Sequence, residues 1–213
     1  METGRIVPQS LYPTQLETRA DGTKTISGYA VVFYQEGNPK TEYQLRSDAV
    51  ERIMPNAFND GIPHAKKDVV ATFDHKRDTV LGRLSNNTLK MTVDTIGLRY
   101  EVPFDANDPD HQRVAAKIER GDITGSSCGF YVSPMGQKIE RSGDKWVRNL
   151  TSITLDEVGP VVNPAYKATT TGLRSADDAS EAITALDAEK ERLDLLSKHQ
   201  EHRKEMLDKI SEA

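Results

Sequence analysis

A chain of 213 residues with 36% hydrophobic and 29% charged residues is long enough for one substantial domain with a modest core and a polar appendage. It has one cysteine, no basic-then-apolar leader and no apolar run near the ~20 residues that cross a bilayer, so we expect no disulfide, no membrane partner and a soluble protein of a reducing cytoplasm. The net charge of −5 lies after Ser175, because residues 1–175 hold 22 basic and 22 acidic side chains, and this neutral body predicts no nucleic-acid partner.

Residues 1–25 contain Pro8, Pro13 and scattered polar side chains without a sustained period, which indicates an extended N-terminal arm. Short β-type runs separated by Gly, Asn, Asp and Pro follow it, at residues 26–33, 69–73, 89–93, 98–102, 123–132, 146–155 and 158–162. This spacing is typical of an antiparallel barrel or sandwich. We therefore expect an α+β fold, mainly an antiparallel β-barrel with flanking helices, over residues 26–168.

Two helical segments interrupt the β-type runs. The clearer one has Asp108 as its N-cap, Pro109 at the first helical position and Gly121 as its stop, with Val114, Ala115 and Ile118 on one stripe. A shorter helical turn is expected at residues 55–59.

Residues 169–213 form a third region, a hinge and then a charged helical tail. Thr169 to Gly172 predict the hinge, and the Ala-, Glu-, Lys- and Leu-rich sequence after it predicts a helix. Apolar residues fit heptad positions at Leu186, Leu193, Leu196, Leu207 and Ile210, but Glu189, Gln200 and Arg203 interrupt the same seam. A weak coiled coil, a solvated helix with one apolar stripe and a docking tail for a partner all remain open.

Three short blocks carry the chemistry. They are His75 with Leu81-Gly82-Arg83 after it, Ser127 within Gly125-Ser-Ser-Cys-Gly-Phe130, and Glu157 within Leu155-Asp-Glu-Val158. Histidine, serine and a carboxylate are the components of a serine-nucleophile triad, which is recognised by geometry and roles rather than by sequence position.

Ser127 is the candidate nucleophile. In a strand, alternate side chains face opposite sides, so Ser127 would share a face with Gly125 and Gly129, whose missing side chains leave room for a substrate. Cys128 is a rival nucleophile, but it would lie on the other face with Ser126 and Phe130 and be a packing residue. The segment is not the nucleophile elbow of an α/β-hydrolase, because the β-type run continues beyond it.

The base that activates the serine must be a histidine, since only its pKa suits the task near neutral pH. His64 lies in a polar connector, and His111 lies in the first turn of the expected helix, where the dipole disfavours an imidazolium. His75 ends an apolar run, where a strand can deliver a side chain to a cleft. His75 is the first candidate on these grounds, although a lone histidine more often has a structural role, so the residues alone leave the choice open.

The third group would orient the imidazole. Glu157 is the first choice, because an acid between Leu155 and Val158 in a β-type run is hard to explain as core, and Asp156 would point to the other face of a regular strand. Candidate oxyanion donors are backbone N–H groups near Ser127 or in a Gly159-Pro160 loop.

The sequence resembles the prohead maturation proteases of tailed bacteriophages, serine peptidases related in fold to herpesvirus assemblin. The likeness covers residues 26–168 and lies in five blocks: residues 28–33, residues 51–58, His75 with residues 81–83, residues 125–130, and Glu157-Val158 with residues 163–166. Two positions depart from the family pattern, which usually has a bulky residue at Cys128 and often a larger one at Ser126.

This resemblance implies a serine endopeptidase of capsid maturation that needs no cofactor or metal, with His75, Ser127 and Glu157 as its triad. Its implied partners are the phage major capsid protein with its scaffold segment, and itself as substrate, and a homodimer is one state open to it. The implied location is the assembling prohead in the host cytoplasm. His111 is a further candidate third member, because assemblin uses a second histidine in that role.

Two other functions compete with this one. A catalytically inactive assembly or scaffolding protein would keep the fold and use the charged tail. An esterase is disfavoured, because the β-type runs do not alternate with helices.

Overall fold

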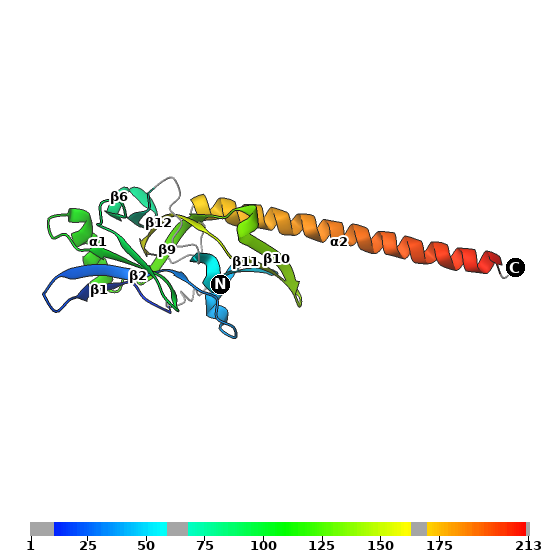
Figure 1. Cartoon of the computed structure of the whole chain (residues 1–213), viewed down its shortest axis with the longest axis horizontal. Helices are drawn as coiled ribbons and strands as arrows, with labels where there is room; N and C mark the ends of the chain where they lie inside the picture. The colour runs from blue at the N-terminus through cyan, green and yellow to red at the C-terminus, as the bar shows by residue number, and fades with distance from the viewer. Residues whose placement is uncertain (1–10, 59–67, 163–169, 212–213) are drawn as a thin grey trace, which may run out of the picture. The chain divides into compact units, whose positions relative to one another are not determined.

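The structure, a computed structural model, describes residues 11–58, 68–162 and 170–211 (Figure 1). The chain divides into two compact units, residues 1–175 and residues 176–213. Within the described residues, the first unit is built mainly of β-strands.

The described residues of this unit form three four-stranded sheets, together with one complete α-helix and short 3-10 helices. The first has the order β1 (Gln15–Thr18), β2 (Lys24–Val32), β8 (Gly97–Pro103), β7 (Lys90–Val93). The second has the order β10 (Gln137–Ser142), β11 (Lys145–Leu150), β4 (Ala49–Ile53), β3 (Tyr43–Arg46). The third has the order β6 (Lys76–Arg83), β5 (Val70–Phe73), β12 (Thr154–Val161), β9 (Gly125–Tyr131).

The α+β class is confirmed, but the predicted closed barrel is not found among the described residues. Each sheet is open, with an edge strand at both ends. Most neighbouring strands are antiparallel, and the exceptions are the parallel pairs β4–β11 and β5–β12. Strand spacing along a sequence predicts strands but not their partners, and these two pairs join segments more than 80 residues apart.

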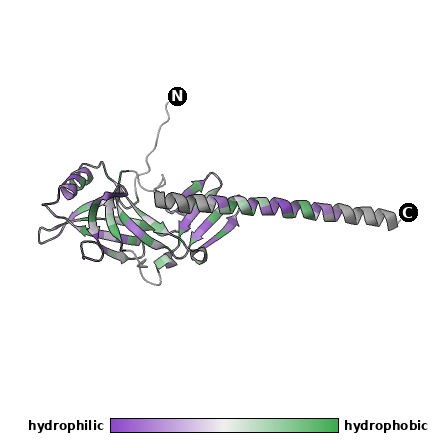
Figure 2. Cartoon of the chain, turned by 90° about the horizontal axis from the view of Figure 1, so that it is seen from above, coloured by the Kyte–Doolittle hydropathy of each residue, from purple (hydrophilic) through white to green (hydrophobic). Residues whose placement is uncertain are grey.

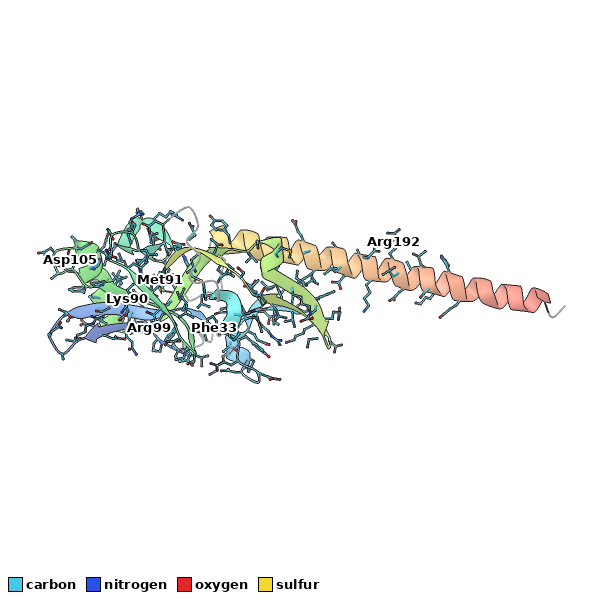
Figure 3. The ribbon with its side chains drawn as sticks, in the orientation of Figure 1. Phe33, Lys90, Met91, Arg99, Asp105 and Arg192 are labelled. Carbon is cyan, nitrogen blue, oxygen red and sulfur yellow. The ribbon has the colours of Figure 1, made fainter. Side chains whose placement is uncertain are left out.

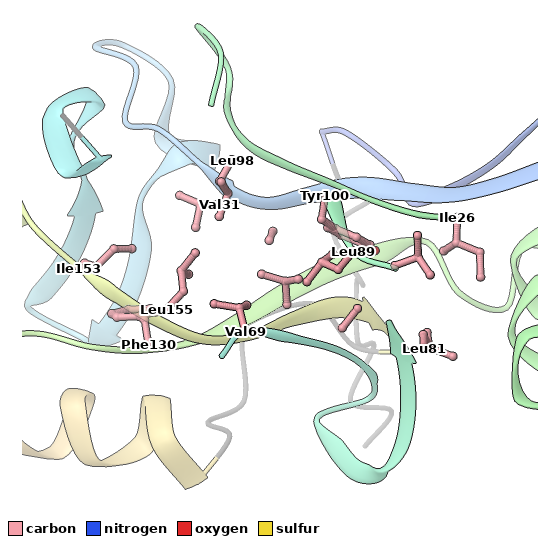
Figure 4. Close-up of a cluster of buried hydrophobic side chains, with 14 of the residues drawn as sticks. Ile26, Val31, Val69, Leu81, Leu89, Leu98, Tyr100, Phe130, Ile153 and Leu155 are labelled. Atoms are coloured by element: carbon pink, nitrogen blue, oxygen red, sulfur yellow. The ribbon is translucent and has the colours of Figure 1, made fainter. Parts of the chain in front are cut away.

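Much of the hydrophobic core lies between the first and third sheets, and Ile53 and Leu150 of the second sheet also belong to it. Figure 4 shows Val31, Leu98 and Tyr100 of the first sheet facing Phe130 and Leu155 of the third. These five residues are at most 9% exposed. Figure 2 shows hydrophobic and hydrophilic residues mixed along the strands. The central strands β5 and β12 are buried on both faces.

Helix α1 (Pro109–Glu119) confirms the clearer predicted helix. The Asp108 side chain accepts hydrogen bonds from the backbone N–H groups of Asp110 and His111, and Gly121 after the helix has a φ of 82°. The predicted stripe of Val114, Ala115 and Ile118 is buried. The expected turn at residues 55–59 is a 3-10 helix, Pro55–Phe58, while Asn59 lies outside the described residues. The other short 3-10 helices are Pro39–Thr41 and Pro134–Gly136.

The N-terminal region differs from the extended arm that the sequence predicts. Its residues 15–18 form β1, which pairs antiparallel with β2, and β2 begins at Lys24 rather than at residue 26. Residues 1–10 lie outside the described residues. Three of the four residues of β1, Gln-Leu-Glu-Thr, are polar, as is common at a sheet edge, so the sequence pattern did not indicate a strand there.

Helix α2 (Thr170–Ser211) is the predicted tail helix. Residues 170–172 of the predicted hinge are already part of this helix. Thr169, the first residue of the predicted hinge, lies outside the described residues. Leu186, Leu193, Leu195 and Leu196 are exposed on it. Arg192, labelled in Figure 3, pairs with Glu189 one turn earlier, with 3.4 Å between nitrogen and oxygen. No helix among the described residues is long and apolar enough to cross a membrane.

Candidate active site

His75 lies in the tight turn between β5 and β6. Phe73 pairs with Lys76, so the loop holds only Asp74 and His75, and both have left-handed backbones with φ of 54° and 59°. Two consecutive left-handed residues are the pattern of a type I′ hairpin turn, which usually takes Asn and Gly. A histidine in this conformation is uncommon and must be held by its surroundings.

The end of β12 provides that hold. The backbone N–H of Asp74 donates to the Pro160 carbonyl oxygen at 3.0 Å, and the Asp74 side chain accepts from the backbone N–H of Val162 at 3.4 Å. The turn that presents His75 is therefore attached to the strand that carries Glu157.

Glu157 is joined to His75 directly. The distance between His75 Nδ1 and Glu157 Oε1 is 2.8 Å, and Thr72 Oγ1 donates to the other carboxylate oxygen, Oε2, also at 2.8 Å. Burial alone would raise the pKa of Glu157, but the hydrogen bonds from His75 and Thr72 outweigh it and leave the pKa below its usual value. Glu157 is therefore a carboxylate at neutral pH, and it accepts a hydrogen bond from the protonated Nδ1 of His75.

A β-bulge at Asp156 gives Glu157 its orientation. Leu155 pairs with Phe130 and Glu157 with Gly129, so Asp156 is an additional residue in β12. In a regular strand Leu155 and Glu157 would share a face. The bulge places them on opposite faces, so Leu155 packs in the core while Glu157 faces the site.

Strand β9 neighbours β12 (Figure 1). The register of the two strands puts Ser127 of β9 on the same face as Glu157. Ser127 pairs with Gly159, one step along the face from the Gly129–Glu157 pair. Diagonal neighbours of this kind have Cα atoms about 7–8 Å apart, a gap that a side chain between them can bridge. Ser127 is buried, and among the described residues the structure records no hydrogen bond between its Oγ and His75.

Lack of space requires glycine at positions 129 and 159. A Cβ at Gly129 would lie 2.9 Å from Cγ of Glu157, and a Cβ at Gly159 would overlap the Thr72 carbonyl oxygen. Gly159 also has a φ of 153°, which side-chain-bearing residues rarely adopt. Gly129 thus leaves the space that Glu157 occupies.

Ser126 and Cys128, the two neighbours of Ser127 in β9, have structural roles. Ser126 Oγ is hydrogen-bonded to Thr14 Oγ1 at 2.7 Å and to Tyr100 OH at 3.0 Å, on the core side of the sheet. Cys128 packs against the core, and burial, with the nearby charges of Glu51 and Glu157, raises the pKa of its thiol to about 12. A thiol that stays protonated is a poor nucleophile, so the predicted packing role of Cys128 is supported.

The competing residues are engaged elsewhere. Asp156 forms an ion pair with Arg77 of β6. His111 is buried, its Nδ1 accepts from the Asp105 backbone N–H at 3.1 Å, and its Nε2 donates to the Leu81 carbonyl oxygen at 2.8 Å. Both ring nitrogens of His111 are thus occupied by backbone groups. His64 lies outside the described residues.

Other predictions for the site also need correction or addition. Gly159 and Pro160 lie inside β12 rather than in a loop, and a proline has no N–H to serve as an oxyanion donor. Sequence reasoning missed Thr72, which no local pattern marks. Among the described residues there is no cluster of three or more His, Cys, Asp or Glu side chains that could hold a metal ion.

Comparison with known proteins identifies a family for this chain. Residues 12–184 match the family model of the caudovirus prohead serine protease, which covers most of the chain and includes His75, Ser127 and Glu157. Neither a curated protein nor a solved structure matches the chain significantly. The chain therefore belongs to the caudovirus prohead serine protease family.

Proposed function

We propose that this protein is the endopeptidase of phage capsid maturation, with Ser127 as nucleophile, His75 as base and Glu157 as the orienting acid. Its substrates are segments of the major capsid protein and its scaffold, together with its own chain, inside the assembling prohead in the host cytoplasm. The observation that carries the proposal is the His75–Glu157 hydrogen bond on the face that Ser127 shares.

The proposed chemistry follows from the protons that these groups hold. Glu157 accepts the Nδ1–H of His75, which leaves Nε2 unprotonated as the base for Ser127 Oγ. As Oγ attacks the peptide carbonyl, Nε2 takes its proton, and the Glu157 carboxylate stabilises the resulting imidazolium. The imidazolium then protonates the leaving amine, and a water molecule activated by His75 releases the acyl group from Ser127.

Co-expression with the cognate capsid protein tests this function. Intact mass should reveal a shortened capsid protein with the wild-type chain and a full-length one with Ser127→Ala. An uncut capsid protein in both cases, with both chains folded, would favour an inactive assembly protein instead.

Replacement of Glu157 tests the third member of the triad. Glu157→Gln removes the charge that stabilises the imidazolium, so we expect kcat to fall on the order of 10² to 10⁴-fold. Asp156→Asn is the matched control, because its partner is Arg77, and its kcat should stay within about three-fold of wild type. If Asp156→Asn is the more damaging change, the assignment of Glu157 is wrong.

The tail is proposed to dock on a partner during assembly. Residues 176–213 carry eleven acidic and six basic side chains, and they form a compact unit of their own. Every proposed catalytic residue and every described strand precedes residue 163.

Truncation after Ser175 should therefore leave a soluble body with a cooperative thermal transition, as followed by circular dichroism. Purified wild-type protein should also lose C-terminal mass on standing, while Ser127→Ala should not. A truncated body that unfolds or precipitates would make the tail structural, and the docking proposal would fail.

A further inference from the structure

We propose that Thr72 is a positioning residue for the reaction, acting through Glu157. The proposal rests on the function given above. Thr72 lies on β5, next to β12, and its side chain is buried. Its hydroxyl donates to Glu157 Oε2, the oxygen that His75 does not use.

The two hydrogen bonds hold the carboxylate at both oxygens. The terminal torsion of a glutamate is broad and has no strong preference of its own, so one hydrogen bond leaves the carboxylate group free to swing. With Oε2 held by Thr72, Oε1 stays directed at His75 Nδ1. The hydrogen bond at Nδ1 then fixes the orientation of the imidazole ring, and with it the direction in which Nε2 points.

Thr72 is itself well fixed. It is β-branched, which restricts its χ1 angle, and its strand lies between β6 and β12. Its carbonyl oxygen lies so close to Gly159 that a Cβ there would overlap it. The donor is therefore rigid and close to the strand that carries the acceptor.

A purely structural role of the Thr72 hydroxyl would have other consequences than a positioning role. If the hydroxyl only satisfied a buried acceptor, its loss would lower the melting temperature and leave the folded enzyme's turnover unchanged. If it positions Glu157, its loss lowers turnover in the folded enzyme, and only while Glu157 is present.

Thr72→Val removes the hydroxyl with little change of shape, and Thr72→Ser keeps it. We expect Thr72→Val to lower kcat about ten-fold with KM unchanged, since a hydrogen bond to a charged group is lost and no substrate contact is involved. Thr72→Ser should stay within about three-fold of wild type. Thr79→Val is the matched control, because Thr79 is also a buried threonine that donates to a carboxylate, that of Asp78, and its kcat should not change.

The decisive comparison repeats Thr72→Val in the Glu157→Gln background. There the additional loss of kcat should be less than about three-fold, because residues that act as one unit are strongly non-additive. Equal losses in both backgrounds, or wild-type kcat in folded Thr72→Val, would overturn the proposal. Should Thr72→Val not fold, Thr72→Cys, with a much weaker donor, provides the same comparison. A wild-type chain without peptidase activity would instead refute the proposed function.

Discussion

Ser127→Ala should abolish peptide cleavage and leave the fold intact. The change removes the attacking oxygen. Ser127 lies two residues before Gly129 and pairs with Gly159, so the loss of one hydroxyl there disturbs little packing. Loss of a serine nucleophile commonly lowers kcat on the order of 10⁶-fold. Turnover of the capsid protein followed by mass spectrometry, beside thermal unfolding of the same sample, measures both parts of the prediction.

Two neighbouring substitutions provide the controls. Cys128→Ser should keep substantial activity, because the raised pKa of the half-buried Cys128 thiol keeps it protonated. Ser126→Ala should also stay active but melt earlier, because the hydroxyls of Thr14 and Tyr100 each lose a partner. An inactive Cys128→Ser together with an active Ser127→Ala would reverse the assignment of the nucleophile.

His75→Ala should be as damaging as Ser127→Ala, and the double variant no worse than either single one. Residues that act as one catalytic unit give losses that do not add. Rates measured for the two single variants and the double variant test this.

The structural setting of His75 makes the result specific. His111 has both ring nitrogens bound to backbone groups, so it is not free to replace His75. An active, folded His75→Ala variant would contradict the assignment of the base.

Sequence patterns predicted several strands closely but missed β1, β3, β4, β6 and β10, of which β4 is buried and lies inside its sheet. β5, β8 and β9 fall within two residues of the predicted runs, because their apolar residues and flanking turns are visible locally. β10 was missed because its sequence, Gln-Lys-Ile-Glu-Arg-Ser, is that of a solvated edge strand. Its pairing with β11 is what makes it a strand.

The site could be predicted in its components but not in its assembly. His75 and Ser127 stand in recognisable blocks, yet the orientation of Glu157 depends on the bulge at Asp156, and a bulge is a property of two paired strands. For the same reason Thr72 could not be found, because its role depends on the pairing of β5 with β12, which are more than 80 residues apart.

The measurement that tests the central claim most directly is covalent labelling of the nucleophile. Diisopropyl fluorophosphate reacts with a serine that an adjacent base has activated, so intact mass should show one adduct on the wild-type chain. Peptide mapping should place it on Ser127, and His75→Ala should not be labelled. An adduct on Ser126 or Cys128, or equal labelling of the folded His75→Ala variant, would contradict the account.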